Sequence, residues 1–263
     1  MSERAPDGTA FDVSGDGSPV VLIHGLGLCR ELWDPMVPAY AARHLAIRYD
    51  LYGHGESAPV PRTADLHLYA EQIVGLLDHL GVERAHIVGF SIGGMINRRL
   101  ALDFPERVAS LAILSSPHDR GEEGQVAVEE RAATVRDQGA LSTMDAALVR
   151  WFTPGHLAEH PEHEAAVRRW RVTAEPESYA QATWTLAHGV RELIGPAEPI
   201  TAPTLVMTAE HDSGSTPAMA HAIAAEIEGA ETIVVPRLQH LGLMEDAAVF
   251  TDPVLDFLEG LDR

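Results

Sequence analysis

Residues 89–94, GFSIGG, hold a serine between glycines. The preceding RAHIV (84–88) indicates a buried strand, and the following MINRRLALDFP (95–105) indicates a helix that a proline stops. A G-x-S-x-G sequence at a strand-to-helix turn is typical of a nucleophile elbow, in which the serine sits on a sharp turn. The alternative interpretation is that Ser91 only caps the helix, because serine is a good N-cap residue.

The glycines of this stretch fit the tight turn that an elbow needs. Side chains two residues to either side of the serine would collide, so Gly89 and Gly93 carry no Cβ atom. The hydroxyl of Ser91 would then point out above the sheet. The backbone N–H of Ile92 opens the following helix, where the helix dipole favours negative charge. We therefore expect Ile92 to supply half of an oxyanion hole.

A serine nucleophile needs a base, and the base needs an acid that orients it. Behind an elbow of this kind the partners follow in the order serine, aspartate or glutamate, histidine. Asp212 follows the apolar run 203–208, and His240 follows the apolar run 231–236. Both come after the C-terminal end of a predicted strand, the edge where open α/β sheets build their sites. The sequence therefore predicts a catalytic triad of Ser91, Asp212 and His240.

Other residues compete for these roles. Glu210 and Asp119 are alternative acids, and their positions favour Asp212 over both. The alternative bases are the histidines His54, His86, His211 and His221. A lone histidine is usually a surface residue or a satisfied core residue. His86 lies within a predicted strand and His221 within a predicted helix, which makes both poor candidates.

The loop HGLGLC (24–29) follows the predicted strand 19–23. Its Leu26 can offer a backbone N–H, and the flanking glycines let the chain approach a substrate closely. We expect Leu26 to be the second oxyanion donor; losing one such donor typically costs about 10²–10³ in rate. Taken alone, this glycine-rich loop would be an ordinary tight turn. His24 is expected to brace the loop rather than to transfer protons.

Short apolar runs recur along the chain and are near-continuous in hydrophobicity, as in strands that are buried on both faces of a parallel sheet. The predicted strands are 19–23, 45–50, 85–89, 108–114, 203–208 and 231–236, with a short edge strand at 9–13. The amphipathic segments 64–81 and 215–229, each ending on glycine, are predicted helices. This alternation predicts an α/β fold with a mostly parallel, doubly wound sheet.

Residues 118–198 break the alternation, because they contain no convincing strand. The helical pieces predicted there lie near 122–138, 141–152, 161–174 and 176–188. We expect a helical cap of residues 118–198, inserted into an α/β core of residues 1–117 and 199–263.

Apolar side chains near the predicted elbow, loop and cap are candidates for the wall of a substrate pocket. They are Trp33, Met95, Trp151 and Trp184. The alternative is that the aromatic residues of the cap only pack the cap together, because buried aromatic residues usually belong to a core.

The composition limits the classes of partner. A chain of 263 residues, 46% of them hydrophobic, is long enough for one large domain with a sizeable core. The net charge is −20, and all 19 basic residues are arginine. Nucleic acids and anionic membranes would be repelled by such a surface. No apolar run reaches the roughly 18 residues that span a bilayer.

The single cysteine, Cys29, excludes an internal disulfide and fits a reducing compartment. Because the first residues are polar and acidic and lack an apolar signal core, we expect a cytoplasmic protein. Cys29 is expected to be a small packed residue rather than a second nucleophile. We expect no metal and no cofactor: the two histidines of HPEH (160–163) lie around a proline at a helix start, which is a poor zinc site.

In combination, these motifs resemble the α/β-hydrolase superfamily. The matching segments are VVLIHGLG, RYDLYGHGES, HIVGFSIGGM, FPERVASLAIL, PTLVMTAEHDSGSTP and VVPRLQHLGLMED. The pattern is similar to the carboxylesterase and 3-oxoadipate enol-lactonase group, with cofactor-free haloperoxidases close by. The resemblance implies an eight-stranded, mostly parallel sheet with a helical cap after the sixth strand, and the same triad and oxyanion donors. The sequence departs from the family at Asn97 and Arg98, where relatives tend to have small apolar residues.

The resemblance implies a serine hydrolase that cleaves a small carboxylic ester through an acyl-serine intermediate. A lactonase and a carbon–carbon bond hydrolase use the same triad and stay open as alternatives. An alternative of another class is a small-molecule binding or receptor protein with little turnover, against which the intact triad argues. The sequence leaves the acyl and alcohol groups, the pathway and the oligomeric state open.

Overall fold

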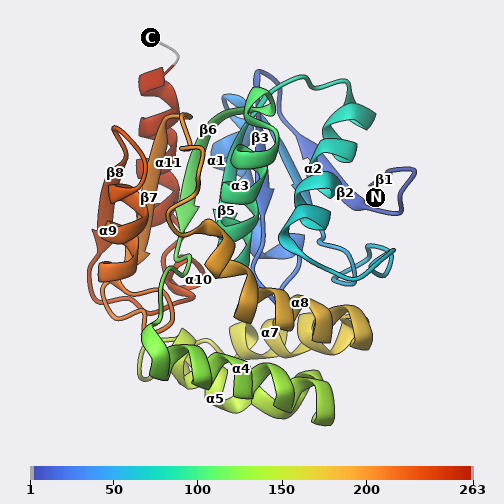
Figure 1. Ribbon diagram of the computed structural model, residues 1–263, viewed down its shortest axis with the longest axis vertical. Coiled ribbons are helices and arrows are strands. Elements are labelled where there is room, and N and C mark those ends of the chain that lie inside the picture. Colours follow the sequence, from blue (N-terminus) through green and yellow to red (C-terminus); the bar gives the residue numbers. More distant parts are fainter. Residues whose placement is uncertain (1–2, 262–263) are drawn as a thin grey trace.

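The sheet contains eight strands, and the computed structural model describes residues 3–261 of the chain (Figure 1). The strands are β1 (Glu3–Arg4), β2 (Ala10–Ser14), β3 (Ser18–Ile23), β4 (His44–Tyr49), β5 (Ala85–Phe90), β6 (Val108–Leu114), β7 (Thr204–Ala209) and β8 (Glu231–Val235). Their order across the sheet is β1-β2-β4-β3-β5-β6-β7-β8. β2 pairs antiparallel with β1 and β4, and the other pairs are parallel. The predicted α/β fold with a mostly parallel sheet is confirmed.

Helices cover both faces of the sheet because successive strand residues are apolar on both sides. In β3, Val21 and Ile23 belong to one core cluster, whereas Val20 and Leu22 belong to the other. The helices on the Val21 face are α2 (Leu66–Leu80), α3 (Ile92–Asp103) and α9 (Pro217–Ala225). Those on the opposite face are α1 (Val37–Ala41) and α11 (Ala248–Leu261).

A separate layer of helices lies between β6 and β7 in the chain. It consists of α4 (Gly121–Gln138), α5 (Met144–Trp151), α6 (His156–Glu159), α7 (Pro161–Thr173) and α8 (Pro176–His188). The remaining elements are short 3-10 helices at Arg30–Trp33, Pro105–Arg107, Ala140–Thr143 and Gly189–Leu193 and the one-turn α10 (Gly242–Glu245). In Figure 1 the cap helices sit below the sheet, under the C-terminal ends of the parallel strands. Any substrate that reaches this edge of the sheet therefore lies between cap and core.

One expectation about the elements is wrong, and one short helix was not predicted. Segment 9–13 was expected at the edge of the sheet, but β1 pairs along the outer side of β2, with Glu3 opposite Phe11. A two-residue strand is too short to leave an apolar run in the sequence. The four-residue α6 was not predicted either, because one helical turn shows no periodicity.

Asn97 and Arg98, which depart from the family pattern, are buried in α3. Asn97 Nδ2 donates to the carbonyl oxygen of Ala112 in β6 at 3.0 Å. Arg98 donates from Nε to Gly94 O at 3.0 Å and from Nη2 to Pro117 O at 2.7 Å. Burial lowers the pKa of Arg98 to about 9. The two side chains thus tie α3 to β6 and to the segment that leaves the sheet for the cap.

In the part of the chain from residue 3 to residue 261, no helix combines the length and the apolar character that a membrane span requires.

The first prediction concerns the central strand β6. Leu111 is fully buried there, so Leu111→Ala is expected to lower the free energy of unfolding by about 2–5 kcal/mol, because the lost side chain leaves a cavity. The matched control is Leu141→Ala in the cap, where the side chain is 48% exposed and the loss should be about 0.5 kcal/mol or less. Urea unfolding followed by circular dichroism measures both. Equal losses would contradict the burial of this strand.

Candidate active site

Ser91 forms the turn between β5 and α3. Its backbone has φ 59° and ψ −115°, a region that non-glycine residues rarely occupy. The Ser91 N–H donates to Leu114 O at 2.8 Å, which fixes the turn against β6. The side chain of Ser91 makes no capping hydrogen bond to α3. The helix-cap interpretation of this serine therefore finds no support, and its hydroxyl is directed elsewhere.

The glycines of the elbow are required by close backbone contacts. A Cβ atom on Gly89 would lie 2.2 Å from Gly93 O, and one on Gly93 would lie 2.6 Å from Ile23 O. These are contacts with backbone atoms that cannot move aside. The α3 helix can therefore approach β3 and β5 closely enough to hold Ser91 above the sheet.

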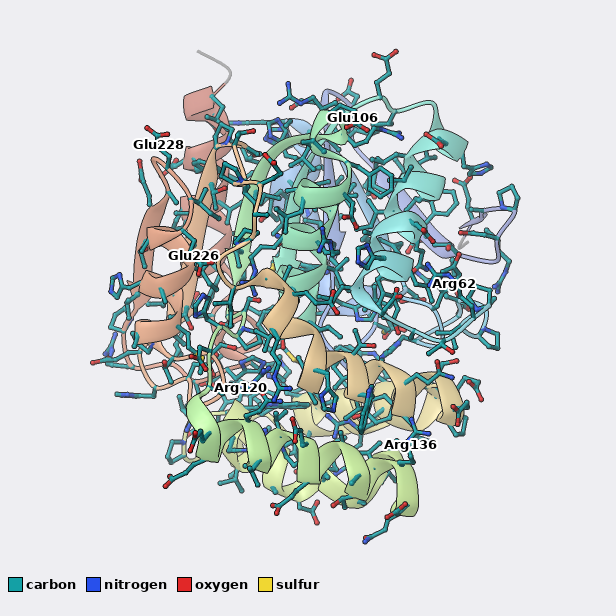
Figure 2. The ribbon with its side chains drawn as sticks, viewed as in Figure 1. Arg62, Glu106, Arg120, Arg136, Glu226 and Glu228 are labelled. Atoms are coloured by element: carbon teal, nitrogen blue, oxygen red, sulfur yellow. The ribbon has the colours of Figure 1, made fainter. Side chains whose placement is uncertain are left out.

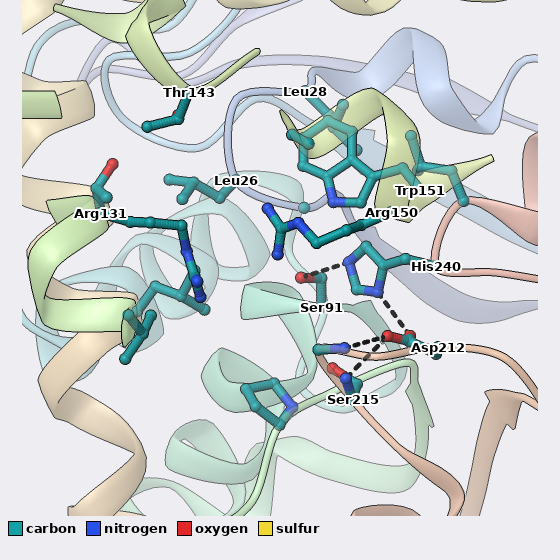
Figure 3. A pocket seen from close by; sticks show the side chains of 18 of the residues that line it. Leu26, Leu28, Ser91, Arg131, Thr143, Arg150, Trp151, Asp212, Ser215 and His240 are labelled. Carbon is teal, nitrogen blue, oxygen red and sulfur yellow. Dashed lines mark hydrogen bonds and ion pairs between the residues drawn. The ribbon is translucent and has the colours of Figure 1, made fainter. Parts of the chain in front are cut away.

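The structure brings Ser91, His240 and Asp212 together, as Figure 3 shows. The Ser91 Oγ lies 3.2 Å from His240 Nε2. His240 Nδ1 lies 2.6 Å from Asp212 Oδ2, so the Nδ1–H donates to the carboxylate and Nε2 is left to accept the serine proton. Serine, base and orienting acid are thus connected in one hydrogen-bonded chain.

Asp212 is held by more than His240. Its side chain is fully buried, and its Oδ1 accepts from Gly214 N at 2.9 Å and from Ser215 N at 2.8 Å. These two backbone donors fix the carboxylate plane and leave Oδ2 for the histidine. The loop after β7 therefore presents an oriented acceptor to the imidazole.

His24 braces the loop that follows β3. It is fully buried; its Nδ1–H donates to Gly25 O at 2.7 Å, and its Nε2 accepts from Leu51 N at 3.0 Å. Burial lowers the pKa of His24 from 6.5 to about 4, so the ring is neutral at neutral pH. Within residues 3–261, neither Leu26 N–H nor Ile92 N–H is paired with a protein acceptor, so both are available to a ligand.

The competing histidines lie in other settings. His54 is buried against the loop, with Nδ1 3.1 Å from Tyr52 O, and burial lowers its pKa to about 3. His86 Nδ1 lies 2.8 Å from Ser110 Oγ inside the sheet. His211 is largely exposed, and His221 lies on α9. His240 is the histidine that reaches the serine.

The competing acids are engaged elsewhere. Glu210 accepts from Arg237 N at 2.8 Å, and Asp119 accepts from Gly121 N at 2.9 Å, where it supports the start of α4. Cys29 is buried, and burial raises the pKa of its thiol. In the described range 3–261, no group of three or more histidine, cysteine, aspartate and glutamate side chains is arranged to hold a metal ion.

A pocket opens in front of Ser91, between the cap and the core. Its lining includes the loop after β3, the elbow and α4, α5, α7 and α8 of the cap. Of the four residues expected at its wall, Trp151 lies there, with its ring centroid 6.2 Å from that of His240. Trp151 was predicted to line the pocket because it lies in the predicted cap.

The other three expected wall residues do not line this pocket. Trp33 is fully buried in the core cluster on the α11 face, and Met95 is fully buried in the cluster on the α3 face. Trp184 is 47% exposed, and its ring lies 4.0 Å from that of His188. Closeness in sequence to the elbow, the loop or the cap does not give the direction in which a side chain points.

Sequence reasoning missed a group of charged residues in the lining. They are Arg120, Arg131, Arg150 and Arg171, from the N-cap of α4, α4 itself, α5 and α7. No motif marked them, because arginines on cap helices are expected at the solvent face. The ends of each cap helix would have to be known to within one residue to show that these four arginines all face the pocket.

Comparison with known proteins agrees with this architecture. A family model described as the alpha/beta hydrolase fold matches residues 18–247. An (E)-2-((N-methylformamido)methylene)succinate hydrolase of Acinetobacter baylyi is 26% identical over 86% of this chain and 85% of its own length. The crystal structure of the enol-lactonase from Burkholderia xenovorans has a TM-score of 0.88 and 28% identity, over 98% of this chain and 100% of that one. A thermophilic esterase from Thermogutta terrifontis, with malate bound, has a TM-score of 0.86 and 26% identity over 99% of each chain.

One prediction tests the elbow geometry. Gly89→Ala is expected to lower the free energy of unfolding by about 2 kcal/mol or more, since the added Cβ would collide with the backbone of Gly93. The matched control is Gly75→Ala in the middle of α2, whose Cβ would lie 3.7 Å from its nearest neighbour. That change should stabilise the protein by about 0.5–1 kcal/mol, because alanine is the better helix former. Thermal unfolding of both variants is the measurement, and two equally tolerated changes would contradict the close packing at the elbow.

Another prediction follows from the buried histidine of the loop. The unfolded chain binds a proton on His24 below about pH 6.5, whereas the folded chain does so only near pH 4. The contribution of the buried, neutral His24 to the free energy of unfolding is therefore fully present above pH 6.5. It declines as the pH falls towards 4, by up to about 1.4 kcal/mol per pH unit.

Urea unfolding between about pH 6.5 and about pH 5 measures this slope. His24→Gln is expected to reduce the slope, and His211→Gln, at a largely exposed position, is expected to leave it unchanged. A slope that His24→Gln does not alter would show that His24 is not a buried neutral group in the folded chain.

Proposed function

The chain belongs to the alpha/beta hydrolase fold family and is a hydrolase, and on that premise we propose that it cleaves a small carboxylic ester through an acyl-serine intermediate. The observation that carries the proposal is His240, which bridges Ser91 Oγ and Asp212 Oδ2 at 3.2 and 2.6 Å. A purely structural histidine would not need a buried carboxylate on one nitrogen and a strained serine on the other.

In the first half of the reaction, His240 takes the proton of Ser91 while Oγ attacks the ester carbonyl. The negative charge that develops on the carbonyl oxygen is stabilised by the N–H groups of Leu26 and Ile92. Asp212 stabilises the imidazolium and keeps its ring in place. His240 then gives the proton to the leaving alcohol, and the acyl group stays on Ser91.

In the second half, water enters and His240 removes its proton. The resulting oxygen attacks the acyl carbonyl, the same N–H groups stabilise the charge, and the acid leaves as Ser91 regains its proton. The net change is ester plus water to acid plus alcohol. The chemistry is complete without a cofactor, and Trp151 supplies an apolar surface beside the imidazole of His240.

Lactone opening is the second candidate, since it uses the same steps with the alcohol and acid joined in one product. The likeness to the enol-lactonase of Burkholderia xenovorans favours it. The Acinetobacter baylyi relative is named as the hydrolase of a substituted succinate. The Thermogutta terrifontis protein is named as an esterase, and the likeness to it favours ester cleavage. A cytoplasmic location is part of the proposal and rests on the lone cysteine, Cys29.

The proposed function predicts that turnover depends on Ser91. Wild type and Ser91→Ala would be compared on p-nitrophenyl esters of increasing acyl length and on several lactones at about pH 7–8. Ser91→Ala is expected to lower kcat by about 10⁴-fold or more, because the nucleophile is lost. The control is Ser142→Ala, an exposed cap serine, which should keep wild-type rates.

The outcomes of this panel separate the candidates. Preference for an ester or for a lactone decides which bond the site cleaves best. Equal turnover by wild type and Ser91→Ala, on folded protein, would overturn the acyl-serine mechanism.

A further inference from the structure

Four arginines converge on the pocket from separate segments of the cap. Arg120 precedes α4, Arg131 lies on α4, Arg150 on α5 and Arg171 on α7. Figure 3 shows the side chains of Arg131 and Arg150 reaching into the space in front of Ser91 from two sides. Figure 2 shows Arg120 where the cap meets the core.

In the described part of the chain, 3–261, none of these four arginines forms an ion pair with a carboxylate. This contrasts with arginines elsewhere in the same protein: Arg30 contacts Asp12 and Asp50, and Arg168, on the same helix as Arg171, contacts Glu164. The chain has 39 acidic residues and 19 arginines, so carboxylates are abundant. Four positive charges without a direct ion pair have therefore collected at one place, in a protein whose net charge is −20. The carboxylate of Asp212 acts on Arg150 and that of Asp119 on Arg120 through space only.

Two of the four are partly satisfied by the cap itself. The Arg171 guanidinium lies 4.8 Å from the ring centroid of Trp151 and 5.6 Å from that of Tyr179. Arg120 Nη2 donates to Leu186 O at 3.1 Å. Of their other buried nitrogens, Arg120 Nη1 and Arg171 Nε have no hydrogen-bond partner among the described residues. These two side chains are fixed parts of a positively charged wall.

The other two keep their terminal nitrogens free. Arg150 donates from Nε to Ala146 O at 3.1 Å, within its own helix, which leaves the fork of the guanidinium open. Arg131 makes no hydrogen bond to any described residue. Apolar residues of the same pocket, such as Val128 and Val135, offer neither side chain an acceptor.

The arginines disfavour one another's charge. Burial lowers the pKa of Arg131, and the nearby charge of Arg150 lowers it further. Burial and the charge of Arg131 lower the pKa of Arg120 to about 10, against a smaller opposing effect of Asp119. Burial also lowers the pKa of Arg150, and the carboxylate of Asp212 opposes this in part. All stay protonated at neutral pH. Like charges in a partly buried space repel each other, and an anion placed among them would relieve both the repulsion and the loss of solvation.

We propose that the substrate carries an anionic oxygen group, a carboxylate or a phosphate, which Arg131 and Arg150 hold while Ser91 attacks the ester carbonyl. The inference rests on the proposed ester hydrolysis and names its substrate class. The planar fork of arginine matches the oxygen pairs of both anions, so two forks can orient one end of a small molecule. Arg120 and Arg171 add to the positive potential behind it. The group lies away from the scissile bond, so hydrolysis proceeds with the same atoms and protons as for a neutral ester.

The experiment compares esters of equal length that differ in charge. The probes are the p-nitrophenyl monoester of glutarate, the neutral p-nitrophenyl valerate and the p-nitrophenyl ester of 4-phosphonobutyrate. Wild type is expected to show a kcat/KM at least about 10-fold higher for an anionic ester than for valerate. The better of the two anionic esters shows whether a carboxylate or a phosphate-like group fits.

Variants then assign this preference to residues. Arg131→Gln and Arg150→Gln are each expected to lower the anionic-to-neutral ratio of kcat/KM by about 10- to 100-fold, chiefly through KM, because a charge-assisted hydrogen bond to the bound substrate is lost. Arg136→Gln is the matched control, since Arg136 lies on α4 like Arg131 but is exposed and does not line the pocket. It should leave the ratio unchanged. Circular dichroism would establish that each variant is folded.

A binding measurement separates this inference from the proposed function. Calorimetry would measure glutarate and 4-phosphonobutyrate binding to Ser91→Ala, with and without Arg131→Gln. At least about 10-fold weaker binding in the double variant would support anion recognition even if no ester were hydrolysed. The inference is overturned if neither anion binds Ser91→Ala, or if wild type prefers valerate. It also falls if the ratio stays the same in Arg131→Gln and Arg150→Gln.

Discussion

The backbone conformation of Ser91 is the constraint on which the site depends. A positive φ at a non-glycine residue is strained, and it persists because its surroundings leave no alternative. Here the Ser91 N–H is bound to Leu114 O in the neighbouring strand, and the Gly89 and Gly93 backbones are in close contact. The sheet therefore holds the hydroxyl where helix capping is excluded and where His240 is within reach. The packing of the central strands thus holds the Ser91 backbone in an unfavourable conformation.

The polar parts of the site are oriented by backbone groups rather than by other flexible side chains. Asp212 is fixed by the N–H groups of Gly214 and Ser215, and His24 spans the loop from Gly25 O to Leu51 N. Backbone donors and acceptors have no side-chain rotamers to order, so the Asp212 carboxylate and the loop of Leu26 are in place before substrate binds. Preorganised groups of this kind stabilise developing charge without the reorganisation that water would require.

The sequence was informative where chemistry restricts the local backbone, and uninformative where only packing decides. That Ser91, Asp212 and His240 lie together could be predicted, because each follows the end of a strand and the three occur in the expected chain order. Trp33 and Met95 could not be placed, because an apolar residue near the elbow fits a buried core as well as a pocket wall. The arginines of the cap were missed for a related reason: whether Arg131 faces the pocket and Arg136 the solvent depends on how α4 sits on the core.

The cap and the loop that carries His240 are joined by hydrogen bonds. Leu241 N, next to His240, donates to Trp151 O at 2.8 Å, and Glu245 accepts from Thr153 N at 2.8 Å. Trp151 ends the helix that carries Arg150. A shift of α5 would therefore move Arg150, which we propose binds the substrate anion, together with His240. The acidic exterior fits this arrangement, because a pocket rich in arginine inside an acidic protein localises the attraction for an anion at the site and away from the rest of the surface.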